Sequence, residues 1–317
     1  MNNPPVISES RRLNKSPTRQ FLENAKGEKP SVTFLSEMLV EELAKAVSLP
    51  NSVTAKRFIR KLFGRATRKF AELGLELDRI VAEGGLSAGA RWIQPRFVAS
   101  NVAQGVEKIP PDGPLVIASN HPGSYDSIMI SAHVARADYE VIIGDIPFFQ
   151  NLPNLRQRAI FAPAVSDVVG RMNTVRESIR HLQAGGSLLI FARGGIEADP
   201  SIAPDADAEF NLWSRSLEIF LRHVPRARVL TTIVSGVIAE AAFRHPITWL
   251  RGARPDKQRL AFMYQMIRQV TSGQEIFGLR ARVTFGELVS GATHQHILEK
   301  VSEAAQRTLG QHLAWAV

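Results

Sequence analysis

The chain has 317 residues, of which 44% are hydrophobic and 22% charged, values typical of a globular protein with one large domain or one domain plus an appendage. It contains no cysteine, which excludes thiol catalysis, disulfide bonds and cysteine-ligated metal sites. The formal net charge of +9 favours an anionic lipid surface, an acidic protein or nucleic acid as partner. Only 7% of residues are aromatic and no nucleic-acid-binding motif is present, so no nucleic-acid partner is expected.

The amino-terminal third divides into a tail and a helical element. Residues 1–30 are rich in Asn, Pro, Ser and basic residues, lack the apolar segment of a secretion signal, and are predicted to be a disordered tail. Residues 31–95 form the predicted helical N-terminal element. Apolar residues recur there at helical spacing over 35–47 and 58–73, and shorter helical pieces follow within 75–92. No apolar run approaches the ~20 residues of a membrane span.

The helix at 58–73, which Gly74 is expected to end, combines an apolar face with many basic residues. One interpretation is an ordinary core-facing helix whose basic side is solvated. The other is a surface for anionic lipid headgroups or an acidic carrier protein, and the two are compatible. The apolar residues are Phe58, Ile59, Leu62, Phe63, Ala66, Phe70 and Leu73, and the basic ones are Lys56, Arg57, Arg60, Lys61, Arg65, Arg68 and Lys69.

Residues 96–317 alternate between strand-like and helix-like segments. This order predicts an α/β domain with a mixed, largely parallel sheet covered by helices on both faces. In such sheets, ligands bind beyond the carboxyl ends of the strands. The expected strands are 115–119, 139–143, 159–162, 187–191, 229–234 and 282–285, and the expected helices are 124–135, 174–183, 212–223, 257–271 and 294–313.

A histidine and an aspartate lie on either side of a turn after the strand at 115–119. His121 follows the strand, Pro122 and Gly123 make the turn, and Asp126 lies in the first turn of the next helix. We expect the carboxylate to meet one imidazole nitrogen, which would fix the tautomer and leave the other nitrogen free as a general base. Spacing alone leaves open that His121 is a polar strand-end residue and Asp126 a helix-terminal one.

The run Asn120-His121-x4-Asp126 resembles the first sequence block of the phospholipid/glycerol acyltransferases, also called the lysophospholipid acyltransferase superfamily. The lead-in at 105–119 is similar as well. The run 183–195 stands where the family has a small-residue turn and a strand carrying Phe-Pro-Glu-Gly-Thr-Arg, and 283–287 resembles a frequent closing strand of the family. The resemblance covers about residues 98–290.

The resemblance implies transfer of an acyl group from acyl-CoA or acyl-carrier-protein to a hydroxyl of a glycerolipid-type or related acceptor. His121 would deprotonate the hydroxyl, Asp126 would orient His121, and the alkoxide would attack the thioester directly. Backbone N–H groups near the Gly194-Gly195 turn or at the start of the helix after Gly123 are candidate oxyanion donors. No cofactor and no metal are implied. The remaining candidate substrate contacts in the first block are Asn120 and Ser124, although Ser124 is also a good helix cap.

The block that holds the acceptor in this family is altered. Arg193 stands in place of the family's Glu, Gly195 in place of Thr and Ile196 in place of Arg. Either Arg193 supplies a phosphate contact in a different way, or the acceptor is not a glycerol phosphate. Glu197 is a candidate replacement for the lost acid. Arg158 is the candidate substrate contact in the second block, where the family pattern is weak.

Two rival functions stay open on these residues. A lipid- or acyl-chain-binding protein could keep the fold after losing the acceptor block, and a hydrolase could use water as the acceptor with the same His/Asp pair. The acidic segment with Asp199, Asp205, Asp207 and Glu209 lacks metal-loop spacing and is expected to be a solvated mobile loop. The expected location is cytoplasmic, with possible peripheral attachment to an anionic membrane surface.

Overall fold

The computed structural model describes most of the chain from residue 30 onward. The expected tail at 1–30 lies outside the described residues, apart from its last position. The described ranges are 30–46, 53–164, 166–203, 206–213, 215–290 and 296–315.

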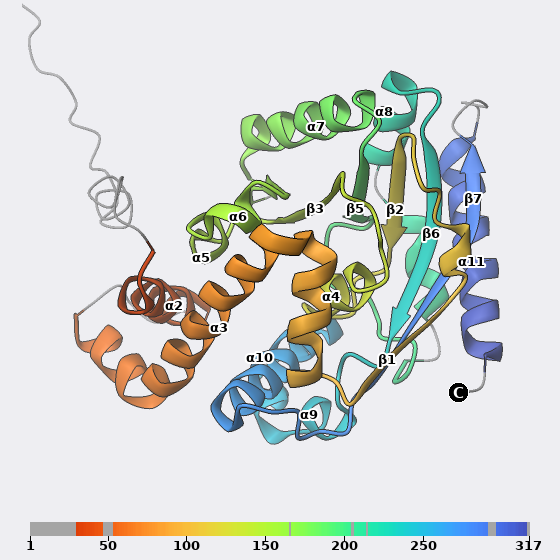
Figure 1. The fold of residues 1–317 in the computed structure, drawn as a ribbon. Helices are drawn as coiled ribbons and strands as arrows, with labels where there is room; N and C mark the ends of the chain where they lie inside the picture. Colours follow the sequence, from red (N-terminus) through yellow and green to blue (C-terminus); the bar gives the residue numbers. More distant parts are fainter. Residues whose placement is uncertain are drawn as a thin grey trace, which may run out of the picture.

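Helices and strands alternate along the chain after two amino-terminal helices (Figure 1). The strands are β1 (Ser100–Gln104), β2 (Leu115–Ser119), β3 (Tyr139–Gly144), β4 (Ala159–Ala162), β5 (Ser187–Phe191), β6 (Arg228–Ser235) and β7 (Arg280–Ser290). The α-helices are α2 (Val32–Ala46), α3 (Val53–Ile93), α4 (Asp126–Ser131), α5 (Pro147–Gln150), α6 (Pro153–Arg156), α7 (Val168–Gln183), α8 (Ser216–His223), α9 (Glu240–Phe243), α10 (Arg254–Ser272) and α11 (Ile297–Ala314). Short 3-10 helices are η1 (Gln94–Arg96), η2 (Val106–Lys108), η3 (Ala206–Leu212) and η4 (Pro246–Leu250).

The strands form one seven-stranded sheet in the order β1-β7-β6-β2-β5-β3-β4. Five neighbouring pairs are parallel, and only β6 and β7 pair in antiparallel fashion. The predicted α/β fold with a mixed, largely parallel sheet is therefore confirmed. Strand β2 lies at its centre, so the residues that follow it emerge between β5 and β6 at the carboxyl edge.

The core lies on both faces of this sheet because successive side chains of a strand point in opposite directions. In β2, Leu115 and Ile117 join a cluster with α4 and α10, whereas Val116 and Ala118 join a second cluster with α8 and α11. All five residues of the strand are fully buried. This double coverage explains why β2 is a continuous apolar run.

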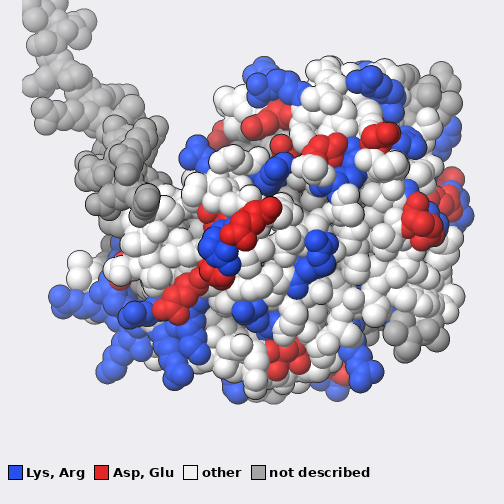
Figure 2. Space-filling model, viewed as in Figure 1, with Lys and Arg blue, Asp and Glu red and all other residues white. Residues whose placement is uncertain are grey.

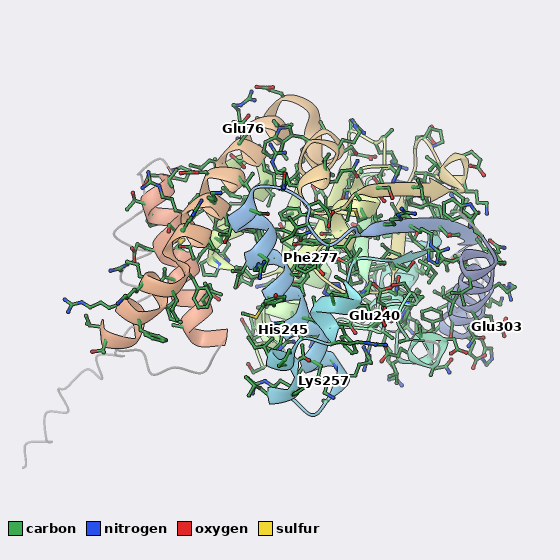
Figure 3. All side chains as sticks on the ribbon, turned by 90° about the horizontal axis from the view of Figure 1, so that it is seen from below. Glu76, Glu240, His245, Lys257, Phe277 and Glu303 are labelled. Carbon is green, nitrogen blue, oxygen red and sulfur yellow. The ribbon has the colours of Figure 1, made fainter. Side chains whose placement is uncertain are left out.

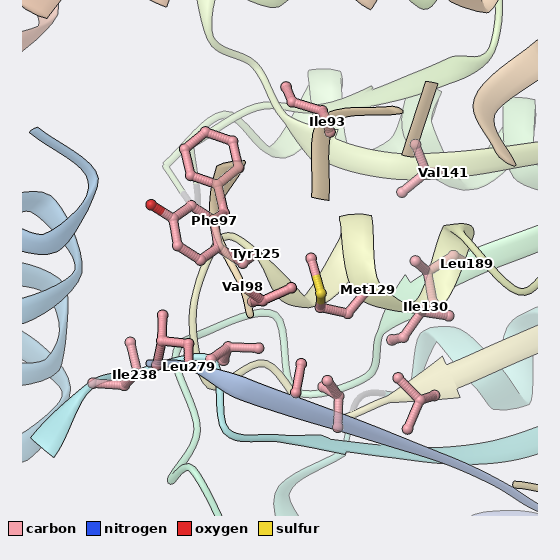
Figure 4. Close-up of a cluster of buried hydrophobic side chains, with 14 of the residues drawn as sticks. Ile93, Phe97, Val98, Tyr125, Met129, Ile130, Val141, Leu189, Ile238 and Leu279 are labelled. Atoms are coloured by element: carbon pink, nitrogen blue, oxygen red, sulfur yellow. The ribbon is translucent and has the colours of Figure 1, made fainter. Parts of the chain in front are cut away.

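The ring of Tyr125 anchors the loop after β2 to the cluster that includes α4 and α10 (Figure 4). Tyr125 stacks on Phe97 with ring centroids 4.5 Å apart and meets the edge of Phe262 at 4.7 Å. Its hydroxyl donates a hydrogen bond of 2.8 Å to Gln269 of α10. Tyr125 directly precedes Asp126, so this packing fixes where α4 begins.

The amino-terminal helices differ from the predicted ones in two respects. Gly74 lies inside α3, where a Cβ would come within 2.5 Å of the Phe148 ring, so the glycine serves close packing and does not end the helix. The backbone leaves helical geometry at Gly85 instead. The apolar face of α3 is also only partly buried, because the side chains of Phe58 and Leu62 are exposed. Lys and Arg side chains gather around this end of the molecule (Figure 2).

Strand β1 is absent from the predicted elements, and β7 is longer than predicted. The sequence of β1, Ser-Asn-Val-Ala-Gln, is half-buried at a sheet edge and has no apolar run that would reveal it. Strand β7 pairs with both β1 and β6. Among the described helices, none has both the length and the apolar character needed to cross a membrane.

Candidate active site

His121 and Asp126 meet across the turn that follows β2. His121 Nδ1 lies 2.7 Å from Asp126 Oδ2, and the same carboxylate oxygen accepts the Gly123 N–H at 3.1 Å. Asp126 is the first residue of α4, and its other oxygen accepts the Ser127 N–H at 2.7 Å. The expected contact between carboxylate and imidazole is therefore present, and Asp126 also holds the turn that makes it.

The surroundings of His121 favour a base with a stabilised charged form. Burial lowers the pKa of His121, but the charge and hydrogen bond of Asp126 and the charge of Glu197 outweigh that effect, so the pKa lies above the ordinary 6.5. An ionised Asp126 assigns the proton to Nδ1, which leaves the lone pair on Nε2. Nε2 has no hydrogen-bond partner within the described part of the chain, and the side chain is 25% exposed.

A cavity of about 620 Å³ opens beside His121 at the carboxyl edge of the sheet. The imidazole stacks on Phe191 at the end of β5, with ring centroids 4.2 Å apart. Most of the wall is apolar and comes from β3, β4, β5 and α7, with two guanidinium groups, Arg171 and Arg193, among the lining residues. The sequence reasoning missed Arg171, since an arginine on an exposed helix face has no distinguishing pattern. The apolar lining comprises Ile142, Ile143, Ala162, Pro163, Val168, Met172, Val175, Ile190, Phe191, Ala192 and Phe220.

Asn120 is a structural residue, which corrects its expected role as a substrate contact. It is 1% exposed and turns away from the cavity toward β6. Its side-chain oxygen accepts the Val234 N–H at 2.9 Å, and its nitrogen donates to the Val234 carbonyl at 3.0 Å. The amide thus continues the pairing between β2 and β6 by one residue and fixes the position from which His121 departs.

Glu197 holds the backbone of His121 and does not reach into the cavity wall. One carboxylate oxygen accepts the His121 N–H at 3.0 Å, and the Glu197 N–H donates to the His121 carbonyl at 2.8 Å. The other oxygen accepts the indole N–H of Trp213 at 2.9 Å. Burial raises the pKa of Glu197 to about 7, against the opposing hydrogen bond from Trp213. The candidate replacement for the lost acid is therefore placed next to the base.

Helix α10 contributes three buried glutamines that the sequence reasoning missed. The Gln258 amide donates to the carbonyls of Pro122 and Glu197, which ties together the two loops on either side of His121. Gln265 bonds to the backbone of Val237 and Ala239, and Gln269 donates to the Phe97 carbonyl. All three are at most 1% exposed. Their spacing of seven and four residues places them on one helix face, which was the available sequence signal.

Arg193 lines the cavity but already has an acidic partner. Its Nη1 lies 2.7 Å from Glu209 Oε1, and Arg254 of α10 contacts the same oxygen. Gly194 lines the cavity at a φ of 74°, and its N–H donates to the Phe191 carbonyl at 2.9 Å, so it is not available to an oxyanion. The Gly195 N–H has no such partner among the described residues. Of the two glycines, Gly195 is thus the one with a free N–H, but it is not among the residues that line the cavity.

Two other candidate substrate contacts lie away from the cavity. Arg158 precedes β4, and its side chain donates to the Ala137 carbonyl at 2.8 Å, at the amino ends of the strands, whereas the cavity lies at their carboxyl ends. The prediction that Arg158 contacts substrate was wrong, because the length of β4 separates Arg158 from the cavity. Ser124 is exposed, does not line the cavity and makes no cap hydrogen bond, since α4 begins without a side-chain cap.

The acidic segment is not a solvated loop at Asp199, which is fully buried. Its carboxylate accepts hydrogen bonds from the N–H groups of Gly236, Val237 and Ile238 after β6, at 3.0 to 3.2 Å. It also accepts from the N–H and the hydroxyl of Ser201. The expected mobile loop is thus wrong at this position, and Asp205 lies outside the described residues. No group of three potential metal-ligating side chains occurs in the described ranges.

Comparisons with known proteins were made at the level of sequence families, curated sequences and solved structures. No protein-family model matches the chain, and no curated protein sequence matches it. Among solved structures, the chain is similar to the 1-acyl-sn-glycerophosphate (LPA) acyltransferase PlsC from Thermotoga maritima, with 14% identity and a TM-score of 0.44. The match covers 90% of this chain and 98% of that chain. A likeness at this level does not decide the reaction, which has to be argued from the site.

Proposed function

We propose that the protein is an acyltransferase that moves a fatty acyl group from a thioester to a hydroxyl of a lipid acceptor. The observation that carries the proposal is the His121–Asp126 pair, whose free Nε2 adjoins a largely apolar cavity of about 620 Å³. A base and an apolar cavity together suit a substrate that has both an ionisable hydroxyl and a hydrocarbon chain.

In the proposed reaction, His121 Nε2 takes the proton of the acceptor hydroxyl as its oxygen attacks the thioester carbonyl. Asp126 stabilises the imidazolium that forms, and the Gly195 N–H is the candidate donor to the tetrahedral oxyanion. Collapse of this intermediate breaks the C–S bond, and the imidazolium returns its proton to the leaving thiolate. The donor is acyl-CoA or acyl-carrier-protein. Arg171 of the cavity wall is the candidate guanidinium group for a phosphate, and Arg193 could add a contact only by sharing or leaving its ion pair with Glu209.

An anionic membrane surface is the proposed site of action, consistent with a cytoplasmic protein peripheral on the membrane. Phe58 and Leu62 of α3 are 56% and 57% exposed among basic residues. Within the described ranges, Arg57, Lys61 and Arg65 have no acidic side chain within 4 Å. An exposed apolar pair inside a basic surface suits lipid headgroups and acyl chains together.

The reaction is tested with labelled acyl-CoA and acyl-carrier-protein against a panel of glycerolipid alcohols. Transfer to at least one alcohol supports the proposal. The two rival functions predict different results. Thioester hydrolysis at a rate independent of added alcohol would identify a hydrolase, and tight lipid binding without turnover would identify a lipid-binding protein.

The pH dependence should report His121. Because the base must be neutral, kcat/KM should rise with pH through a pKa above 6.5 and fall away below it. Asp126→Asn removes the charge that raises this pKa while burial still lowers it, so the rising limb should move to lower pH and the rate should drop by about 10³-fold or more. The measurement is the pH–rate profile of both proteins.

Burial raises the pKa of Glu197 to about 7, so Glu197 provides the control for that profile. Its carboxylate contacts the His121 backbone N–H and the Trp213 indole, and not the imidazole. Glu197→Gln should therefore keep a rising limb, moved to lower pH because the charge of Glu197 helps to raise the pKa of His121. If the rising limb disappears in Glu197→Gln and does not move in Asp126→Asn, the limb reports Glu197 and not His121.

Acyl-chain length should be limited by the apolar wall formed by α7. Val175 lines the cavity one helical turn beyond Met172. Val175→Phe adds volume there, so kcat/KM for a long acyl donor should fall about tenfold or more relative to a short donor. Each variant is compared with itself across donor lengths, which removes effects on folding. Equal losses for the long and the short donor would mean that the acyl chain does not bind along α7.

A further inference from the structure

The 3-10 helix η4 presents two large apolar side chains to solvent. Trp249 is 73% exposed and Leu250 is 74% exposed, which together with Val169 (73%) are the highest values among the large apolar residues described. The neighbouring Thr248 is only 1% exposed. A single exposed apolar residue is common, but an adjacent exposed Trp and Leu at the end of a turn indicates a contact surface.

The local structure holds these side chains outward. His245 Nδ1 accepts the Ile247 N–H at 3.2 Å and the ring stacks on Tyr264, with centroids 4.1 Å apart. The Thr248 hydroxyl lies within hydrogen-bond distance of the carbonyls of Phe243 and His245, at 3.0 and 2.8 Å. These contacts, together with the Arg251 N–H that donates to the Thr248 carbonyl at 3.1 Å, fix the backbone from which Trp249 and Leu250 leave on the solvent side.

The surroundings of the turn are basic. Residues 240–259 contain five basic and two acidic side chains, a net charge of +3. Arg251 and Lys257 have no acidic side chain within 4 Å in the part of the chain that the structure describes. His245 and Lys257, on the two sides of the turn, both lie on the underside of the molecule in Figure 3. This combination complements a negatively charged partner with an apolar interior.

The turn is connected to the cavity through the start of α10. Arg254 lies four positions after Leu250, which corresponds to at most about 14 Å of chain. Arg254 shares Glu209 with Arg193 of the cavity wall, and Gln258, one turn further, bonds to the carbonyl after His121. The turn is therefore linked, through the start of α10 and Glu209, to Arg193 in the cavity wall.

We propose that Trp249 and Leu250 insert into the interface of an anionic phospholipid bilayer and hold the cavity mouth against it. An indole side chain prefers the headgroup region of a bilayer, and Leu adds apolar area below it. An acidic protein would complement the charge but needs a groove for the two side chains and leaves their exposure unexplained. The inference deepens the proposed function, on which it rests for the reason why a bilayer adjoins the cavity.

The test is binding of the full chain to vesicles, measured by cosedimentation without any substrate. Vesicles of phosphatidylcholine with phosphatidylglycerol should bind the protein, and Trp249→Ser/Leu250→Ser should weaken binding about tenfold or more. Arg251→Gln should weaken it about fivefold and mainly at low salt. The matched control is Leu313→Ser on α11, an exposed leucine (53%), which should bind as the unaltered protein does.

A second readout uses brominated lipids, which quench tryptophan fluorescence at the bilayer depth of the bromine. The quenched component should disappear in Trp249→Ser and persist in Leu313→Ser. His121→Ala should bind vesicles normally, so a failure of the acyltransferase proposal leaves this result interpretable. Unchanged vesicle binding by the double serine variant would overturn the inference. Loss of binding to acyl-carrier-protein, in a protein that ignores vesicles, would overturn it in favour of an acidic protein partner.

Discussion

Replacing His121 with alanine is expected to lower the rate of acyl transfer by about 10²- to 10⁴-fold, the usual contribution of a general base. Nε2 is the ring nitrogen left free by Asp126, and it adjoins the cavity in which the acceptor would bind. Without the imidazole, the hydroxyl must lose its proton to water. The measurement is kcat/KM with saturating donor, together with thermal unfolding to show that the variant is folded.

The variant also leaves the buried carboxylate of Asp126 without one of its partners, so a second substitution is needed. His121→Asn keeps an N–H donor near the Nδ1 position but has no base, and it should be as inactive as His121→Ala with smaller loss of stability. His223→Ala, on the exposed end of α8, is the matched control and should retain full activity. A folded His121→Asn protein with normal turnover would exclude the proposed mechanism.

The central strand and the His/Asp turn could be predicted because their signals are local. Strand β2 is an uninterrupted apolar run, and the Pro-Gly turn limits where Asp126 can lie relative to His121. The residues of β2 also end at the sheet edge where ligands bind, so the position of the base followed from the fold class. Strand β1 carries no such pattern, since a half-buried edge strand has neither strict alternation nor an apolar run.

The partners of the site could not be predicted because they come from distant parts of the chain. Asn120 and Arg158 lie within the segments that resemble a known family. The side chain of Asn120 nevertheless pairs with β6, and Arg158 lies at the opposite edge of the sheet from the cavity. Gln258 lies 136 residues from the Pro122 carbonyl that it binds. Whether a polar side chain faces substrate or backbone depends on such long-range contacts, which no spacing rule contains.

The largest effect on stability is expected from Asp199→Ala. Asp199 is fully buried, and its carboxylate accepts hydrogen bonds from three successive N–H groups after β6 and from Ser201. Alanine would leave the three N–H groups buried without acceptors, and each such group costs about 1–3 kcal/mol. The contacts are not additive, so we expect a loss of about 4 kcal/mol in the free energy of unfolding, measured by urea denaturation.

The control for that measurement is Asp207→Ala, eight residues along the same acidic segment. Asp207 is exposed, so its removal should change the free energy of unfolding by less than about 0.5 kcal/mol. The Asp199 variant should also lose activity in the fraction that remains folded, because the segment joining Asp199 to Glu197 fixes the backbone of His121. Equal, small effects of the two substitutions would mean that the N–H groups after β6 find water as an acceptor. The buried acid would then contribute neither to the fold nor to the position of the base.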